Sequence, residues 1–331
     1  MNKRFIKLYV ERTFSMKFSD TSDFIIENWK PLFRYISYFI LPLSLVEGVN
    51  LSGYFSSVMS MNNGSNLQDD TIISMLVNVG VLLVLSFVAS VITSAVVYAL
   101  MKIYQEREEK LNGLTMSILK PYLISSIKKS AAVVAVIILL CILLFAIDCA
   151  LIVVHPLLFF FGLIALLVVT VPMALMLPMA QFEDIKIFAA IKKSFVYGFK
   201  TWGGVFSIII ILSMITGMFC GLLSIPMYIL LMLKSFTEGS LDSSLSAITN
   251  SAWYTALTYL STTAYIYVYQ LGASIMLVGL AYQYGHAAAK IGDKGIEERV
   301  DNFEELGAVD DEKHLEGDAE EDAIDSAFKG I

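Results

Sequence analysis

Long stretches without any charged side chain constrain the fold of this chain most strongly. Such stretches cover residues 71–101, 149–182, 201–233 and 243–289. A helix needs only about 20 predominantly apolar residues to cross the hydrocarbon core of a bilayer. A typical soluble domain is about one-quarter charged, whereas this chain is 16% charged and 57% hydrophobic, with a mean hydropathy of +0.71. The runs are also too long, and alternate too little, for the strands of a membrane barrel. The sequence therefore predicts an all-α, polytopic membrane protein.

Six segments are long enough to serve as transmembrane helices. They lie at approximately 31–46, 72–101, 131–151, 157–179, 202–223 and 257–282. The first is the shortest, and it is bounded by Arg34 and Glu47. The long side chain of Arg34 can extend to the membrane interface, which makes a short span acceptable.

The basic residues are strongly segregated along the chain. Of the 23 Lys and Arg residues, 22 lie up to Arg34, in 102–129, in 186–200 or after His286, and the exception is Lys234. Loops rich in Lys and Arg stay on the cytoplasmic side of the membrane. We therefore expect both termini in the cytoplasm. The Ser- and Asn-rich segment 48–70 has no basic residue and is expected to be an external loop.

Basic amphipathic stretches precede three pairs of spans, at 23–30, 114–129 and 183–200. In the third stretch, Lys186, Lys193 and Lys200 fall opposite an apolar face, and Trp202 follows. Such helices typically lie in the headgroup layer with their lysines toward anionic lipid. These four residues are therefore candidate lipid-headgroup contacts. The alternative is a cytoplasmic helix that packs on the bundle. The spacing is also compatible with three helix-hairpin repeats.

Composition divides the chain into three parts: a cytoplasmic N-terminal segment (1–18), a six-span membrane domain (19–285) and an acidic cytoplasmic tail (286–331). The tail contains half of the acidic residues of the chain. Its apolar residues at 296, 300 and 303 predict one short amphipathic helix. Residues 309–325 have the composition of a disordered segment.

One part of the sequence resembles a known family. The motifs are Val171-Pro172, Leu177-Pro178, a helix of the form A-x-x-x-S (190–194) and G-x-x-x-W (198–202), with Gly279 to Tyr284 near the end. They resemble bacterial (Bacteroidetes-type) multipass membrane proteins similar to the membrane domain of glycerophosphoryl diester phosphodiesterases. The resemblance covers about residues 16–303 and implies a bacterial inner (cytoplasmic) membrane. No part of the sequence resembles the catalytic domain of those enzymes, so it implies no activity.

Three polar residues in or near the spans are candidates for an intramembrane site: Glu47, Asp148 and Gln270. Ionisable groups are expensive to bury in a bilayer, and Glu47 and Asp148 are predicted at matching ends of their spans. Together they are suited to binding a cation or a lipid amine. The alternative places both carboxylates in interfacial water, with Gln270 in an interhelical hydrogen bond.

Two further patterns concern the packing of the spans. Ser213, Gly217 and Gly221 recur at four-residue spacing, which predicts close approach to another helix or to a second copy of the chain. The last span is rich in Tyr, including Tyr265 and Tyr269. These rings are expected either to line a wet crevice or to lie in the interfacial aromatic belt.

The sequence predicts a non-enzymatic integral inner-membrane protein that associates with lipid or with membrane-protein partners. It contains no motif for a catalytic, cofactor or metal site, and its three histidines are dispersed. The expected partners are membrane lipid and either other membrane proteins or a second copy of the chain, with no cofactor and no nucleic acid. The alternative is a transporter or lipid-translocating channel with a crevice between the spans.

Overall fold

The computed structural model describes residues 5–62, 69–238 and 247–292, and every regular element named in these ranges is an α-helix. The helices are α1 (Phe14–Glu27), α2 (Trp29–Asn62), α3 (Asp69–Glu106), α4 (Met116–Val154), α5 (Pro156–Met173), α6 (Met176–Phe182), α7 (Ile187–Lys200), α8 (Trp202–Glu238) and α10 (Ala252–Ile291). Within the described residues, six helical segments are long and apolar enough to cross a membrane. The prediction of an all-α polytopic protein is confirmed.

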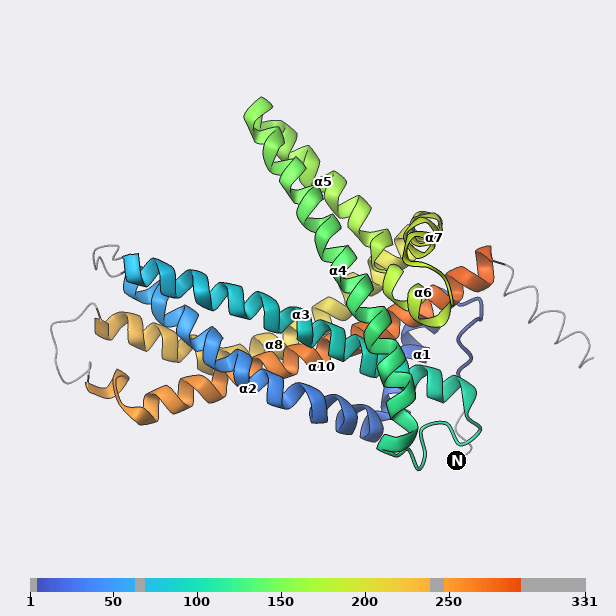
Figure 1. Cartoon of the computed structure of the whole chain (residues 1–331), viewed down its shortest axis with the longest axis horizontal. Helices are drawn as coiled ribbons and strands as arrows, with labels where there is room; N and C mark the ends of the chain where they lie inside the picture. The colour runs from blue at the N-terminus through green and yellow to red at the C-terminus, as the bar shows by residue number, and fades with distance from the viewer. Residues whose placement is uncertain (1–4, 63–68, 239–246, 293–331) are drawn as a thin grey trace, which may run out of the picture.

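Four long helices, α2, α3, α8 and α10, run side by side along the length of the molecule (Figure 1). Helix α10 packs against the other three. Two glycines permit its close contact with α8. A Cβ atom on Gly272 would lie 2.1 Å from Cγ2 of Thr216, and one on Gly279 would lie 2.5 Å from Cδ1 of Leu212. Small residues therefore set the α8–α10 distance, as in other membrane helix pairs.

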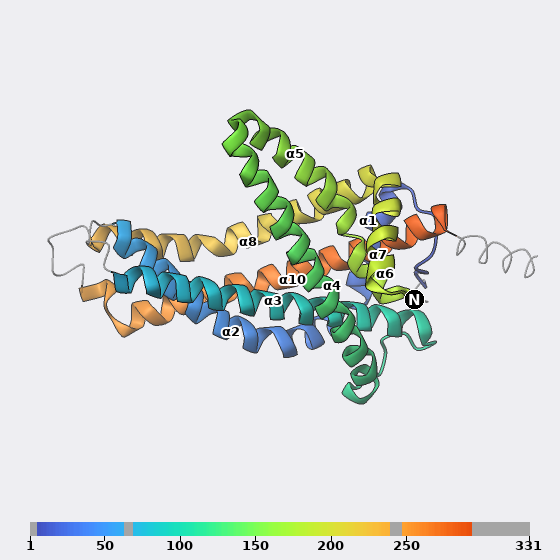
Figure 2. The same ribbon diagram turned by 45° about the horizontal axis from the view of Figure 1, so that its top comes forward.

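Helices α4 and α5 form an antiparallel hairpin that diverges from the bundle (Figures 1 and 2). At its turn, the imidazole Nδ1 of His155 accepts a hydrogen bond of 3.2 Å from the Leu157 N–H. Pro156 occupies the first position of α5, where its missing N–H has no consequence. The sides of the hairpin are apolar and largely exposed, as at Phe160 and Phe161. Surfaces of this kind are expected to contact lipid.

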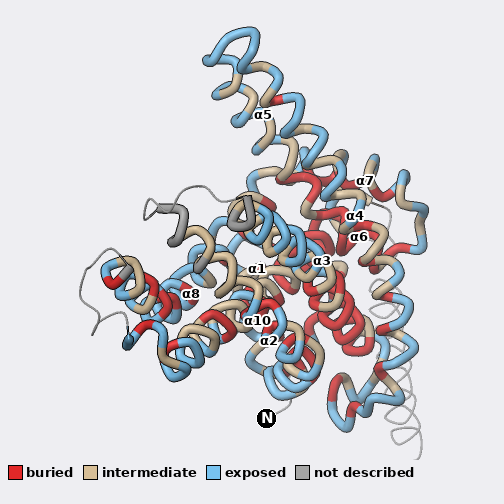
Figure 3. The backbone as a smooth tube through the Cα atoms, turned by 60° about the vertical axis from the view of Figure 1, so that its left-hand side comes forward, coloured by how far each residue is buried: buried red, intermediate tan, exposed pale blue. Residues whose placement is uncertain are grey.

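Helices α1, α6 and α7 gather at the end of the bundle that also holds the N-terminus and the last turns of α10 (Figure 1). We call it the basic end, defined by residues 5–34, 102–129, 183–201 and 283–292. Many buried residues lie at this end and on the adjoining turns of α3, α6 and α10 (Figure 3). Phe24 packs edge-to-face on Tyr104 and Tyr282, with ring centroids 5.0 Å and 6.1 Å apart. The fold is therefore anchored at this end.

Helix α7 is seen nearly end-on in Figure 1 and so runs crosswise to the bundle. A separate short helix thus precedes the α8/α10 hairpin, and α1 precedes the α2/α3 hairpin. The second amphipathic stretch, 114–129, differs because it forms the first turns of α4 and is continuous with the span.

Several helices extend beyond the predicted spans. Helix α2 continues through Gly48 to Asn62, so most of the expected external loop 48–70 is helical. Its serines do not interrupt the helix, because they bond to the preceding turn, as Ser57 Oγ does to the Gly53 carbonyl at 3.1 Å. Helix α10 likewise continues past residue 285 to Ile291. The predicted tail helix and the acidic segment 309–325 lie outside the described residues.

The fourth predicted span is broken near its end. Helix α5 stops at Met173, and α6 begins at Met176. Pro178 has no N–H to donate to the carbonyl of Ala174, and its ring clashes with that carbonyl in a continuous helix. The proline therefore accounts for the break that separates the span from α6.

Candidate functional site: a polar cavity among the spans

A cavity of about 350 Å³ lies between α2, α3 and α10. Its lining combines polar and apolar side chains: Glu47, Ser86, Ser90, Tyr265, Tyr269 and Gln270 with Leu51, Leu82 and Ile266. A mostly apolar cavity with a few convergent polar groups is the usual form of a small-molecule site. Two of the three predicted intramembrane residues, Glu47 and Gln270, are therefore brought together.

Glu47 provides the charge of this cavity. Its side chain is buried, with 3% of the residue exposed. The Ser86 hydroxyl is within hydrogen-bonding reach of the carboxylate, whereas the Oε2 atom has no hydrogen-bond partner among the residues that the structure describes. Transfer of an unpaired, ionised carboxylate from water to an apolar medium costs at least several kcal/mol. The cavity therefore presents a strong acceptor that one more donor would satisfy.

Gln270 is held by a neighbouring helix. Its Oε1 atom accepts a hydrogen bond of 3.2 Å from Thr93 Oγ1 on α3. Among the described residues, no hydrogen bond uses its Nε2 group. The amide nitrogen is thus left as a donor, and Glu47 lines the same cavity as an acceptor, so the cavity offers both a donor and an acceptor.

Close contact between α2 and α10 places Glu47 in the cavity. Thr262 Oγ1 donates to the Gly48 carbonyl at 3.3 Å, and the Tyr259 hydroxyl donates to the Leu45 carbonyl at 3.1 Å. A Cβ atom on Gly48 would lie 2.2 Å from Oγ1 of Thr263. Only glycine at this position lets the two backbones approach this closely, which fixes the neighbouring Glu47.

A second cavity, of about 340 Å³, lies on the α8 side of α10. Tyr265 and Tyr269 line both cavities. Gly217 and Gly221 also line the second one, and a Cβ atom on either glycine would meet nothing within 4 Å. The prediction that Ser213, Gly217 and Gly221 form a close-packed seam is therefore wrong for the contacts within this chain. Gly272 makes the close contact with α8, and the small residues leave a hollow instead.

Asp148 is not part of the cavity. It lies near the tip of the α4/α5 hairpin, which points away from the bundle. A Cβ atom on Gly162 of α5 would lie 1.6 Å from its Oδ1 atom, so the carboxylate occupies the room left by this glycine. Both of its oxygens are buried, and within the described ranges neither has a hydrogen-bond partner. The pairing of Asp148 with Glu47 in one site is therefore wrong, because the two hairpins diverge.

The candidate headgroup contacts on and after α7 have different surroundings. Lys186 and Lys200 are exposed. Lys193 donates to Glu183 Oε2 at 2.6 Å. Burial acts to lower the pKa of Lys193, but its hydrogen bond with Glu183 and the charge of that residue produce a net rise. Trp202 is half-buried, and its Nε1 donates to the Val168 carbonyl at 3.1 Å. Lys186 and Lys200 are thus accessible, whereas Lys193 already has an anionic partner.

Comparison of the chain with protein families, curated proteins and solved structures finds no match. The resemblance to the phosphodiesterase membrane domain therefore stays a prediction.

Proposed function

We propose that this integral membrane protein is a non-enzymatic lipid-binding protein that holds the headgroup of a bilayer lipid against Glu47. The observation that carries the proposal is the buried Glu47 carboxylate, with one oxygen unpartnered, in the wall of a cavity. A primary amine supplies both a hydrogen-bond donor and the opposite charge, and charge-assisted bonds of this kind are the strong ones. The preferred ligand class is therefore a lipid with an ammonium headgroup.

The position of the cavity suits a lipid headgroup. Glu47 follows the start of α2 at Trp29 by a distance of about 27 Å along the helix. A hydrocarbon core about 30 Å thick that begins at the basic end thus ends close to Glu47. Ser86 and Ser90 of α3 are exposed, so the cavity opens sideways between the helices. A lipid can enter from its own leaflet without crossing the bilayer.

Measurement of lipid binding to the purified full chain tests this proposal. Phosphatidylethanolamine, which has an ammonium donor, is compared with phosphatidylcholine, which has no N–H, by native mass spectrometry in a mild detergent. We expect preference for the ethanolamine lipid, and Glu47→Gln should weaken that binding by about tenfold or more. Asp148→Asn is the matched control, because it removes the other buried carboxylate. Equal binding by wild type and Glu47→Gln contradicts the proposal.

The second cavity favours one alternative, a lipid-translocating protein. Tyr265 and Tyr269 separate the two cavities, so their rotation would join them. Filling the second cavity with Gly217→Leu tests this alternative without touching Glu47. Lipid transfer between the leaflets of proteoliposomes, abolished by Gly217→Leu, supports translocation. Its absence in the wild type leaves binding alone.

A further inference from the structure

A buried lysine that has no anionic partner among the described residues lies at the basic end. Lys17 of α1 is 6% exposed. No described residue forms a hydrogen bond or ion pair with its ammonium. Burial, together with the charges of Lys290 and Arg12, lowers the pKa of Lys17 to about 8. The surroundings of Lys17 thus disfavour its positive charge.

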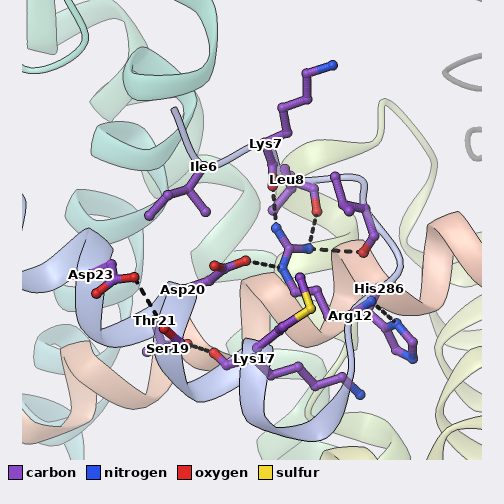
Figure 4. Close-up of polar contacts among 12 residues, drawn as sticks. Ile6, Lys7, Leu8, Arg12, Lys17, Ser19, Asp20, Thr21, Asp23 and His286 are labelled. Carbon is purple, nitrogen blue, oxygen red and sulfur yellow. Dashed lines mark hydrogen bonds and ion pairs between the residues drawn. The ribbon is translucent and has the colours of Figure 1, made fainter. Parts of the chain in front are cut away.

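The neighbouring acid does not compensate this charge. Asp20 accepts a hydrogen bond of 2.7 Å from Arg12 Nε, and both side chains of this ion pair are buried. The Arg12 guanidinium also donates to carbonyls of the N-terminal segment, including that of Leu8 at 2.8 Å. The backbone N–H of Arg12 donates to His286 Nδ1 at 2.9 Å. Figure 4 shows the Lys17 side chain extending away from Asp20, with no dashed contact at its ammonium. Arg12 and Asp20 therefore neutralise each other, and Lys17 remains in excess.

A fully buried amide lies beside this lysine. Gln283 of α10 is 0% exposed, and neither its Oε1 nor its Nε2 atom has a hydrogen-bond partner in the part of the chain that the structure describes. A Cβ atom on Gly204 of α8 would lie 2.8 Å from Gln283 Nε2 and 3.1 Å from Lys17 Nζ. The unpartnered amide and the unpartnered ammonium thus converge on one point of the α8 backbone.

That point is the first turn of α8. The N–H groups of Gly204 and Val205 donate to the Thr201 carbonyl at 2.9 Å and 3.1 Å. The N–H groups of Trp202 and Gly203 have no hydrogen-bond partner among the described residues. Free N–H groups and the helix dipole give a helix N-terminus a partial positive charge. A buried ammonium beside it is repelled unless an anion joins the two.

We propose that Lys17, Gln283 and the first turn of α8 bind a phosphate group, carried either by a lipid headgroup or by free phosphate. A phosphate at a helix N-terminus accepts hydrogen bonds from the free N–H groups, and the helix dipole stabilises its negative charge. Lys17 supplies the balancing cation and Gln283 Nε2 a neutral donor. The absence of a side chain on Gly204 leaves these groups close to the backbone. This site lies at the basic end, away from the cavity of Glu47, and does not depend on the lipid-binding proposal.

The experiment measures thermal unfolding of the full chain in a neutral detergent. One arm adds inorganic phosphate, with chloride at equal ionic strength as the reference, and the other adds mixed micelles of phosphatidic acid or phosphatidylcholine. We expect one of the two phosphate sources to raise the midpoint. Lys17→Met should weaken that binding by about tenfold or more, whereas Lys192→Met, which removes an exposed lysine of α7, should leave it unchanged.

A pair of glycine variants tests the position. Gly204→Ala places a methyl group between Lys17, Gln283 and the backbone, and should weaken the response. Gly203→Ala adds the same group where nothing lies within 4 Å, and should preserve the response.

A response to phosphatidic acid alone identifies a lipid headgroup, and a response to inorganic phosphate identifies the free anion. No response in either arm, or an equal response in Lys17→Met, overturns the proposal. Glu47→Gln should respond like the wild type.

Discussion

The uncompensated charge of Lys17 makes a prediction about stability that runs against the usual effect of mutating a buried residue. The folded protein lowers the pKa of Lys17 from 10.5 to about 8. Each unit of pKa shift corresponds to about 1.4 kcal/mol. In phosphate-free buffer at pH 7, the protonated lysine therefore reduces the free energy of unfolding by about 3 kcal/mol. We expect Lys17→Met, which keeps most of the length of the side chain and removes its charge, to be more stable than the wild type.

The sign of the pH dependence follows from proton binding. Between pH 8 and pH 10.5 the unfolded state holds more protons at residue 17 than the folded state, so the stability of the wild type rises with pH. Below pH 8 both states are protonated and the full penalty is present. The advantage of Lys17→Met should therefore shrink by about 2 kcal/mol between pH 7 and pH 9.5. Among the described residues, the titratable groups that face Lys17 are Arg12, with its partner Asp20, Lys290 and His286.

Equilibrium unfolding in mixed detergent micelles at pH 7 and pH 9.5 measures this difference. Lys192→Met is the control, because its lysine is exposed and surface substitutions usually change stability by less than about 0.5 kcal/mol. A difference between wild type and Lys17→Met that does not change with pH refutes the electrostatic reasoning. A large loss of stability in Lys17→Met at pH 7 refutes it as well.

Two further predictions concern packing and orientation. A Cβ atom on Gly285 would lie 2.0 Å from the Leu8 carbonyl oxygen, so Gly285→Ala should reduce the free energy of unfolding by about 2 kcal/mol or more. The control is Gly80→Ala, because a Cβ atom there would meet nothing within 4 Å. It should show no such loss in the same denaturation assay. Segregation of the basic residues predicts that a reporter active only in the cytoplasm works when fused at Ile331 and fails at Gly64, and the reverse pattern contradicts the expected orientation.

The positions of the spans could be predicted because the cost of burying charge in lipid dominates all other terms. The ends of the helices could not, since a helix does not stop at the membrane boundary. Thus α2 continues past Gly48 and α4 begins before its span. The divergence of the α4/α5 hairpin arises from tertiary packing, which leaves no periodic signal. For this reason Glu47 and Gln270 could be predicted as candidate site residues, whereas the separation of Asp148 from them could not be predicted.

The phosphate site has an even weaker signature in the sequence. Lys17, Gly204 and Gln283 are far apart along the chain, and each is ordinary in its local context. Their convergence depends on the packing of α1, α8 and α10 at the basic end. A sequence pattern marks groups on one helix face, but it does not show which faces of three helices meet.

From the divergence of the α4/α5 hairpin we expect this protein to respond to the thickness of its bilayer. The apolar part of α4, residues 131–154, is about 36 Å long, and it meets a hydrocarbon core of about 30 Å. Tilting resolves such a mismatch at a modest energetic cost. Because most of the apolar surface of the hairpin is exposed, we expect its angle to the bundle to follow the membrane, opening in a thinner bilayer and closing in a thicker one.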